Sequence, residues 1–253
     1  MTTGRRRPPA HWSRLSSGGD VFLGDRGLGV GRVGAQARDR LADDARDLHL
    51  RHADPLADLG LPVPELVTLA LPAELARAEP DPEIQDLLHA SAGINLGVDF
   101  LPGSLPFTPA AVAEIDPELA ADVVWLDALT TNVDRTPRNP NLLVWHGRTW
   151  LIDHGAALFR QHGSRPLAST AHEPYPTIAD HVLLGAAGSL HEADERLAEP
   201  AQAALATAVA LVPEAWLGDD PSGRRDDLAG FLTERLRAPR AFVGEAEEAR
   251  ARA

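Results

Sequence analysis

The stretch TNVDRTPRNPNLLVWHGRTWLIDHG, residues 131–155, joins a polar loop to two short apolar runs. The loop carries Asp134 and Asn139, and Asp153 stands at the end of the second run. Residues 146–148, His-Gly-Arg, separate the runs and predict a three-residue hairpin loop, because glycine accepts the positive φ that such a loop needs. A hairpin returns the chain, so Asp153 is expected to lie beside the two loop residues.

These residue types are the ones that phosphoryl transfer requires. One carboxylate can orient and deprotonate an attacking hydroxyl, while an amide oxygen and a second carboxylate hold Mg²⁺ against nucleotide phosphates. Mg²⁺ prefers hard oxygen ligands and few protein groups, so Asn139 and Asp153 with phosphate oxygens and water form a sensible shell. The alternative is structural, because an Asp-Arg-Thr-Pro loop can also cap a helix and make local ion pairs.

The composition excludes several classes of protein and of site. The 253 residues contain no cysteine, which excludes disulfides and thiolate metal sites. A formal net charge of −13 argues against a general nucleic-acid binder, which needs a basic face. No apolar run is long enough to span a membrane, and Arg5, Arg6 and Arg7 are followed by prolines rather than by a signal-peptide core. We therefore expect a cytoplasmic protein with no membrane partner.

The order of predicted elements favours an α+β fold. A turn and a buried strand are expected within residues 59–71, and a short strand is expected after residue 94. Asp81 as N-cap, Pro82 at the first helical position and Gly93 just past the end predict a short helix within 81–93. The remaining predicted elements follow the same reasoning: one or two helices over 109–131 that restart at Asp116-Pro117, hairpin strands at 141–145 and 149–153, and helices at 178–188, 190–211, 224–237 and 240–251.

The opening stretch resembles the catalytic segment of the HipA-like kinases, bacterial relatives of the protein and lipid kinase fold. In that family an N-x-D-R-x-x-x-N loop is followed by a hairpin and an Ile-Asp-His/Phe-Gly element. The resemblance also extends to LGLPVPE at 59–65, to GINLGVDFLPG at 93–103, and through the helices to about residue 250. The matching loop and hairpin residues are Asn132, Asp134, Arg135, Asn139, Asp153, His154 and Gly155.

The resemblance implies a two-lobed protein-kinase-like fold, with a reduced or disrupted N-lobe and a mainly helical C-lobe that contains the catalytic hairpin. It implies ATP and Mg²⁺ as cofactors, Asp134 as catalytic base, and Asn139 and Asp153 as magnesium ligands. The other matching residues, Asn132, Arg135, His154 and Gly155, would support them.

The resemblance also places the hinge, whose backbone meets the adenine, near Phe100, Leu101 and Pro102. A strand end of this composition is otherwise ordinary core, and that interpretation stays open. The same scheme divides the chain into an atypical, disordered or misassigned N-terminal segment at 1–58, a remnant N-lobe and hinge at 59–108, and a helical C-lobe at 109–253.

The first 58 residues depart from the family pattern. A kinase of this type needs a strand lysine that pairs with the nucleotide phosphates, and a glutamate that holds it. All 24 basic residues of this chain are arginines, and an arginine fork does not occupy the place of an ammonium group. GVGRVG at 29–34 matches a phosphate loop, G-x-G-x-x-G, but its flanks do not supply the required strand and helix, so chance spacing is the preferred interpretation.

Several residues keep two interpretations. Arg135 and Arg138 either contact phosphate or brace neighbouring carboxylates, with bracing preferred. Asp127 either supports the loop by hydrogen bonding or faces solvent. His154 and His181 could line a cleft, although surface or core placement is preferred and their spacing does not indicate zinc.

Three functions remain open. The first is an ATP- and Mg²⁺-dependent kinase that acts on a hydroxyl of a protein or small-molecule acceptor. The second is a pseudokinase or nucleotide-binding module that lacks turnover because the lysine is missing. The third is a helical interaction protein with no nucleotide site.

Overall fold

The computed structural model describes Leu56 and residues 59–253, and the structural statements below concern these residues. They fall into two compact units: residues 64–102, and residues 103–253 together with Leu56 and 59–63. Both units combine helices with a small sheet, which is compatible with the predicted α+β class. No helix of the described residues is long and apolar enough to cross a membrane. The predicted atypical segment at 1–58 and the Gly-rich match at 29–34 lie outside the described residues, apart from Leu56.

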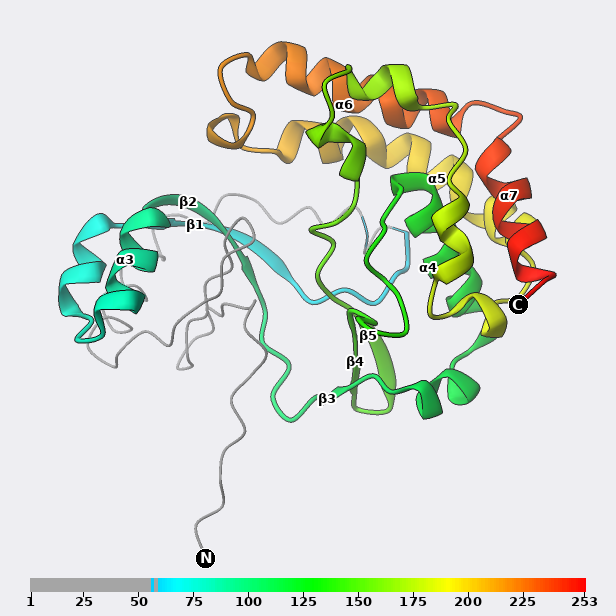
Figure 1. Cartoon of the computed structure of the whole chain (residues 1–253), viewed down its shortest axis with the longest axis horizontal. Helices are drawn as coiled ribbons and strands as arrows, with labels where there is room; N and C mark the ends of the chain where they lie inside the picture. Colours follow the sequence, from blue (N-terminus) through cyan, green and yellow to red (C-terminus); the bar gives the residue numbers. More distant parts are fainter. Residues whose placement is uncertain (1–55, 57–58) are drawn as a thin grey trace, which may run out of the picture. The chain divides into compact units, whose positions relative to one another are not determined.

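The first unit is an antiparallel strand pair with a helical connection (Figure 1). Strand β1 (Leu66–Leu71) pairs with β2 (Gly93–Val98), and the connection holds the 3₁₀-helix η2 (Ala73–Ala78) and helix α3 (Pro82–Ala90). Helix α3 begins as predicted, because the carboxylate of Asp81 accepts the backbone N–H of Glu83. It ends at Ala90, and Gly93, which was predicted to lie just past the helix, starts β2 with a φ of 113°.

The second unit contains a three-stranded sheet and a group of helices. The strands are β3 (Leu105–Pro106), β4 (Leu142–Trp145) and β5 (Arg148–Leu151). The α-helices are α4 (Pro117–Thr130), α5 (Leu190–Leu211), α6 (Pro221–Leu236) and α7 (Ala241–Arg250). The 3₁₀-helices are η3 (Pro109–Glu114), η4 (Phe159–His162), η5 (Leu167–Thr170), η6 (Pro176–Asp180), η7 (Leu184–Ala186) and η8 (Glu214–Trp216).

Helix α4 forms the centre of the second unit and packs against α5, α6 and α7. From Val123 to Leu129 its side chains are buried on every face, as expected for a helix segment that packs on all sides. The Trp125 ring lies 5.7 Å from the ring of Phe242 on α7, and its indole Nε1–H donates to Asp194 on α5 at 2.9 Å. Asp116 caps the start of α4, so the predicted restart at Asp116-Pro117 is confirmed.

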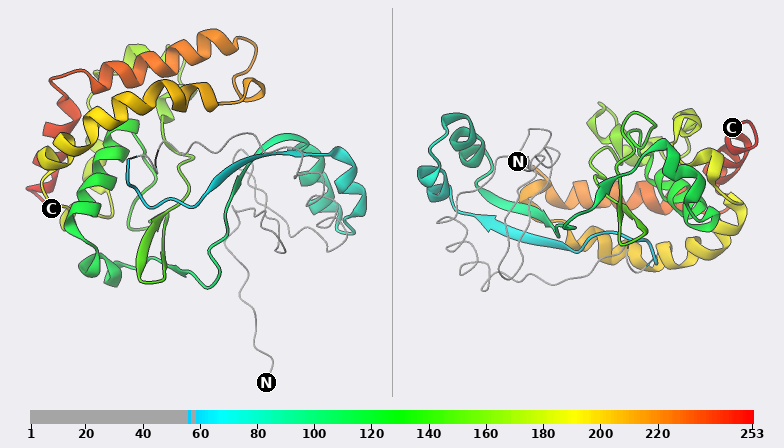
Figure 2. Two further views of the ribbon diagram at one scale, coloured as in Figure 1. Left: turned by 180° about the vertical axis from the view of Figure 1, so that it is seen from behind. Right: turned by 90° about the horizontal axis from the view of Figure 1, so that it is seen from below.

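The predicted helices at 190–211, 224–237 and 240–251 correspond to α5, α6 and α7, and α5 and α6 lie side by side (Figure 2). The predicted helix at 178–188 is wrong, because η6 and η7 occupy this segment as short 3₁₀ turns. The reason is that two backbone N–H groups of this segment donate to acceptors outside a helical pattern. The Val182 N–H donates to the carbonyl of Arg135 at 3.0 Å, and the Leu183 N–H donates to the ring of His181 at 3.1 Å. Neither amide is left for a helical hydrogen bond.

The hairpin of β4 and β5 has a shorter loop than predicted. Arg148 pairs with Trp145, so the loop consists of His146 and Gly147 alone. Both have positive φ, 50° and 72°, which matches a two-residue turn with the twist of the flanking strands. The other end of the hairpin joins the segment at 59–63, because the Leu151 N–H donates to the Pro62 carbonyl at 2.8 Å.

A buried arginine closes the C-terminal end of α4. Arg235 of α6 donates to the carbonyls of Ala128 and Leu129 at 2.6 and 2.8 Å, and to that of Ala171 at 2.9 Å. The last carbonyls of a helix have no partner within the helix and carry partial negative charge, so a guanidinium satisfies both needs. Burial lowers the pKa of Arg235 to about 10, which leaves it charged at neutral pH.

Replacing this arginine should therefore destabilise the protein. We predict that Arg235→Met lowers the free energy of unfolding by about 3 kcal/mol or more, because buried carbonyls lose their donors. The control Arg237→Met removes an exposed arginine of the same helix region and should cost within about 0.5 kcal/mol. Urea unfolding at neutral pH measures both, and equal losses would contradict the role assigned to Arg235.

Candidate active site

The loop after α4 starts with a sharp turn. Thr131 is fully buried and has a φ of 52°, in the left-handed region, and it ends the helix. Asn132 then fastens the loop to α4, because its backbone and side-chain N–H groups donate to the carbonyl and carboxylate of Asp127 at 2.9 and 3.0 Å. The Asn132 side-chain oxygen accepts the backbone N–H of Asp134 at 3.2 Å. This turn presents Asp134 at the front of the loop.

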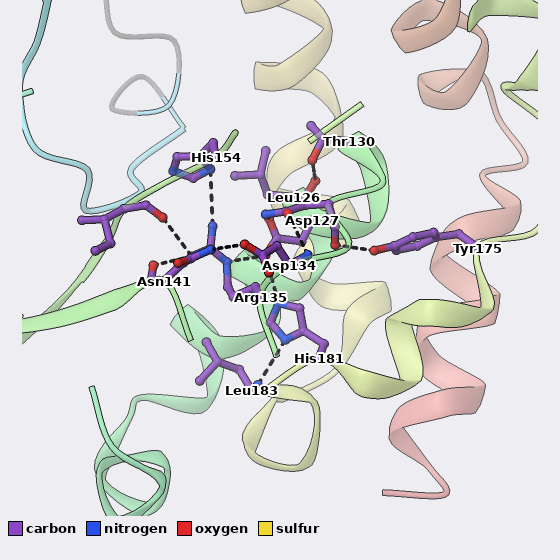
Figure 3. A network of polar contacts seen from close by, with 12 residues as sticks. Leu126, Asp127, Thr130, Asp134, Arg135, Asn141, His154, Tyr175, His181 and Leu183 are labelled. Carbon is purple, nitrogen blue, oxygen red and sulfur yellow. Dashed lines mark hydrogen bonds and ion pairs between the residues drawn. The ribbon is translucent and has the colours of Figure 1, made fainter. Parts of the chain in front are cut away.

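A fully buried ion pair lies beneath this turn (Figure 3). The Nε of Arg135 lies 2.5 Å from Oδ2 of Asp127, and neither side chain is exposed. Arg135 also donates through Nη1 to the carbonyls of Asn141 and Ile152, at 2.6 and 3.4 Å. A buried charge is tolerated only when it is paired and hydrogen-bonded, as this one is. Arg135 thus ties helix α4 to both chain segments at the open end of the hairpin, which agrees with the preferred bracing interpretation.

Two histidines complete the surroundings of this pair. His181 Nε2 lies 2.9 Å from Oδ2 of Asp127, and its Nδ1 accepts the Leu183 N–H. Only a neutral ring with its proton on Nε2 makes both contacts, and burial lowers the pKa of His181. His154 faces Nη2 of Arg135 with Nδ1 at 3.4 Å, and burial together with the Arg135 charge lowers its pKa to about 4.

The same interactions set the charge of Asp127. Burial alone would raise the pKa of this carboxyl, but the Arg135 charge and the hydrogen bond from His181 outweigh it. The pKa of Asp127 is therefore held below its usual range, and the group stays ionised at neutral pH. Sequence reasoning left Asp127 open between a supporting role and exposure to solvent; it is completely buried and supports the loop.

Tyr175 holds the loop from the opposite side. Its hydroxyl donates to the carbonyl of Asn132, and its ring is almost completely buried. Burial raises the pKa of Tyr175 to about 12, so the hydroxyl remains a donor at any physiological pH. The backbone N–H of Asn132 is thereby fixed by α4, and its carbonyl is fixed by the segment before η6.

Asp134 is bound on one side only. Its Oδ2 accepts the side-chain N–H groups of Asn139 and Asn141, at 2.7 and 3.2 Å. Its Oδ1 receives no hydrogen bond from the described part of the chain. Asn139 reaches Asp134 because Thr136 and Asn139 exchange two backbone hydrogen bonds, each of 3.1 Å, around a tight turn. The five-residue spacing read from the sequence thus brings Asp134 and Asn139 into direct contact.

Asp153 follows the end of β5. The predicted strand is two residues too long, because β5 ends at Leu151 and Asp153 has a φ of 51°. Its Oδ1 accepts the Gly155 N–H at 3.2 Å, and a Cβ at position 155 would lie 3.1 Å from that oxygen. The Ile152 N–H donates to the Asn141 carbonyl at 3.0 Å, so Asp153 leaves the hairpin next to the residue that also binds Asp134.

Positive φ angles cluster around this loop. Thr131, Asn141 and Asp153 all adopt the left-handed conformation, with φ between 49° and 52°. Asn and Asp tolerate this region, whereas for the β-branched Thr131 it is strained, at a cost on the order of 1–3 kcal/mol. The surrounding contacts therefore hold the backbone in a conformation that it would not choose alone.

The oxygen atoms that Asn139 and Asp153 leave available suit Mg²⁺ as a ligand set. A carboxylate only accepts hydrogen bonds, so Asn139 must turn its amide nitrogen toward Asp134, and this leaves its amide oxygen available. Asp153 has a second carboxylate oxygen, Oδ2, beyond the one that Gly155 occupies. Within the described residues no group of three or more His, Cys, Asp or Glu is placed to hold a metal. A small oxygen set completed by phosphate and water suits Mg²⁺ better than a closed protein cage.

The structure brings some of the residues singled out in the sequence together and leaves others apart. One hydrogen-bonded network connects Asn132, Asp134, Arg135, Asn139 and His154. No hydrogen bond joins Asn139 to Asp153, although both lie at the hairpin end. The predicted hinge at 100–102 belongs to the first unit, where Leu101 is buried.

Sequence reasoning missed Asn141 and Tyr175 and did not assign His181 to the loop. Asp127 had a usable signal, since a lone acid inside the apolar run VVWLDAL must find a buried partner. Asn141 precedes a strand and offered a weaker signal. Tyr175 and His181 lie more than forty residues from their partners in the sequence, and no local pattern marks them.

Breaking the buried pair should be costly. We predict that Asp127→Asn lowers the free energy of unfolding by about 3–5 kcal/mol, because it leaves the buried guanidinium of Arg135 without a counter-charge. The control Asp122→Asn, on the same helix, removes a partly exposed pair with Arg196 and should cost about 1 kcal/mol or less. Urea unfolding compares them, and equal losses would show that the buried pair has no special weight.

His181 should make the protein less stable in acid. Its folded-state pKa lies below the ordinary 6.5, so the unfolded chain binds the extra proton first as the pH falls. The contribution is complete above pH 6.5 and is lost as the pH falls below that value. We predict that the loss of stability between pH 7.5 and 5 is smaller in His181→Gln than in the wild type. The control His162→Gln, at an exposed position, should keep the wild-type dependence, and an unchanged dependence in His181→Gln would refute the assignment.

Comparison with known sequences identifies the family of the chain. The sequence model of the HipA-like kinase family matches residues 53–238, which is most of the chain and includes the loop and hairpin described above. No curated protein and no solved structure matches the chain. On the evidence of the family match, the chain belongs to the HipA-like kinase family.

Proposed function

We propose that this protein is a kinase that transfers a phosphoryl group from ATP, with Mg²⁺, to a hydroxyl of a protein or small-molecule acceptor. The proposal rests on the carboxylate of Asp134, of which, within the described residues, one oxygen accepts hydrogen bonds and the other does not. Two amides hold its Oδ2, and its Oδ1 is left for a hydroxyl. Two observations favour a kinase over a helical interaction protein. The chain belongs to the HipA-like kinase family, and a buried ion pair lies beneath the loop that carries Asp134.

Asp134 acts as the base in this proposal. The acceptor hydroxyl donates to Oδ1, and the hydrogen bonds on Oδ2 keep the carboxylate in one orientation during proton transfer. Asn141 and Asn139 therefore position Asp134 in addition to any ligand they hold. The left-handed turn at Thr131 and the Asn132 contacts set the direction in which Asp134 points.

Asn139 and Asp153 would hold the metal through the amide oxygen and the free carboxylate oxygen described above. When bound, Mg²⁺ neutralises charge on the phosphates and orients them. Arg135 takes no part in phosphate binding in this scheme, since its guanidinium is enclosed by Asp127 and two carbonyls.

The proposal includes a two-lobed kinase-like arrangement in which ATP contacts the backbone near Phe100, Leu101 and Pro102. It rests on family membership and on the matching sequence at 93–103. Residues 64–102 would then be the reduced N-lobe, with the β1–β2 pair as its remaining sheet.

One observation favours a second candidate, a pseudokinase that binds nucleotide without turnover. The chain has no lysine to pair with the nucleotide phosphates. The two candidates share the metal residues and differ only in turnover, so a binding experiment tests both and a turnover experiment separates them.

Nucleotide binding should stabilise the fold and should depend on Mg²⁺. We predict that millimolar ATP raises the Tm in the presence of Mg²⁺, and that Asp153→Asn removes the dependence on Mg²⁺ because it removes a charged oxygen ligand. A matched control, Asp180→Asn, alters an exposed aspartate and should respond as the wild type does. If ATP with Mg²⁺ produces no shift in the wild type, both nucleotide candidates fail.

Turnover should depend on Asp134. We predict that Asp134→Ala lowers ATP turnover or autophosphorylation by about 10²-fold or more while nucleotide binding persists, as expected for loss of a general base. Equal turnover in wild type and variant would exclude Asp134 as the base. A wild type that binds MgATP with no turnover at all would identify the pseudokinase.

A further inference from the structure

The arginines of the second unit are almost all engaged. Arg135 and Arg235 are enclosed by carboxylate or carbonyl oxygens, and Arg148 lies over the ring of Trp150. The others that bind a carboxylate or a backbone oxygen are Arg160, Arg165, Arg196, Arg224, Arg225, Arg237, Arg240, Arg250 and Arg252. Among the described residues of this unit, Arg138 alone has no hydrogen bond, ion pair or ring contact.

Arg138 occupies a defined position. It lies at the tip of the turn whose ends, Thr136 and Asn139, exchange both backbone hydrogen bonds. Pro137 precedes it, and proline fixes φ at this place in a turn. The side chain is exposed, and the next residue, Asn139, is bonded directly to Asp134. The cationic side chain of Arg138 thus extends from a turn that two backbone hydrogen bonds fix. The next residue, Asn139, contacts the proposed base.

An anionic ligand at this loop would need a cation, and the exposed Arg138 is the arginine of the loop whose charge no described carboxylate neutralises. Asp134 and Asp153 place negative charge at the loop, and the positive charge of Arg135 is already neutralised by Asp127. A triphosphate adds further negative charge, and the chain has no lysine to offset it. An arginine fork binds phosphate oxygens in a bidentate manner, with stronger hydrogen bonds than neutral donors make.

We propose that Arg138 binds the phosphoryl group that is transferred. The inference rests on the proposed kinase function and deepens it. In the step, the acceptor oxygen bonds to the γ-phosphorus as the bond from that phosphorus to the β–γ bridging oxygen breaks. The acceptor proton passes to Asp134, and ADP leaves. Arg138 stays bound to the equatorial oxygens, where charge is spread in the transition state.

Nucleotides that differ in phosphate number provide the test. We expect Arg138→Ala to weaken binding of MgATP about tenfold or more, as loss of a hydrogen-bonded charge pair does, and to change MgADP and AMP far less. Arg138→Lys should recover part of the loss, since an ammonium keeps the charge without the fork. Arg252→Ala, an exposed arginine at the chain end, is the control and should bind all three nucleotides as the wild type does.

The outcomes are distinguishable. If the wild type binds MgATP and Arg138→Ala keeps the same ratio of ATP to ADP affinity, the assignment of Arg138 is wrong and the kinase proposal stands. Unchanged nucleotide binding combined with a raised KM for an acceptor would assign Arg138 to the acceptor and overturn the inference. If the wild type binds no nucleotide, the proposed function itself fails. An unchanged Tm of the apo variant would confirm that Arg138→Ala leaves the fold intact.

Discussion

The buried pair of Asp127 and Arg135 is the interaction on which the candidate site depends. Asp127 comes from the central helix α4, and Arg135 comes from the loop that follows it. Through Arg135 the pair reaches the open end of the hairpin, and through His181 it reaches the segment between η6 and η7. One charge pair therefore sets where the proposed base and the proposed metal ligands stand.

The free-energy cost of burying the Asp127–Arg135 pair explains why the backbone around it is irregular. Removing two charges from water is unfavourable unless nearly every donor and acceptor finds a partner. Asn132, His181 and two backbone carbonyls fill those positions around the pair. These partners also divert backbone groups away from regular structure, as the Val182 and Leu183 amides show. The irregular segment before α5 and the strained turn at Thr131 are consequences of building the site.

The sequence predicted the parts of the structure that depend on local patterns. The Asp116 and Asp81 caps, the long helix at 190–211 and the hairpin all follow from residue type and spacing. The contact of Asp134 with Asn139 also lies within one turn. The helix predicted at 178–188 from its composition failed because the Val182 amide bonds to the Arg135 carbonyl and the Leu183 amide bonds to the ring of His181. Tyr175 and His181 could not be placed, since their partners lie far away in the chain and only the packed fold brings them to α4.

A double-mutant cycle measures how strongly Asp127 and Arg135 are coupled in the folded protein. The free energy of unfolding would be measured for the wild type, Asp127→Asn, Arg135→Met and the double variant. If the pair holds the loop, each single change leaves an uncompensated buried group, and the double variant should lose less than the sum by about 2 kcal/mol or more. Additive losses would contradict the account, because they would mean that the two side chains contribute independently.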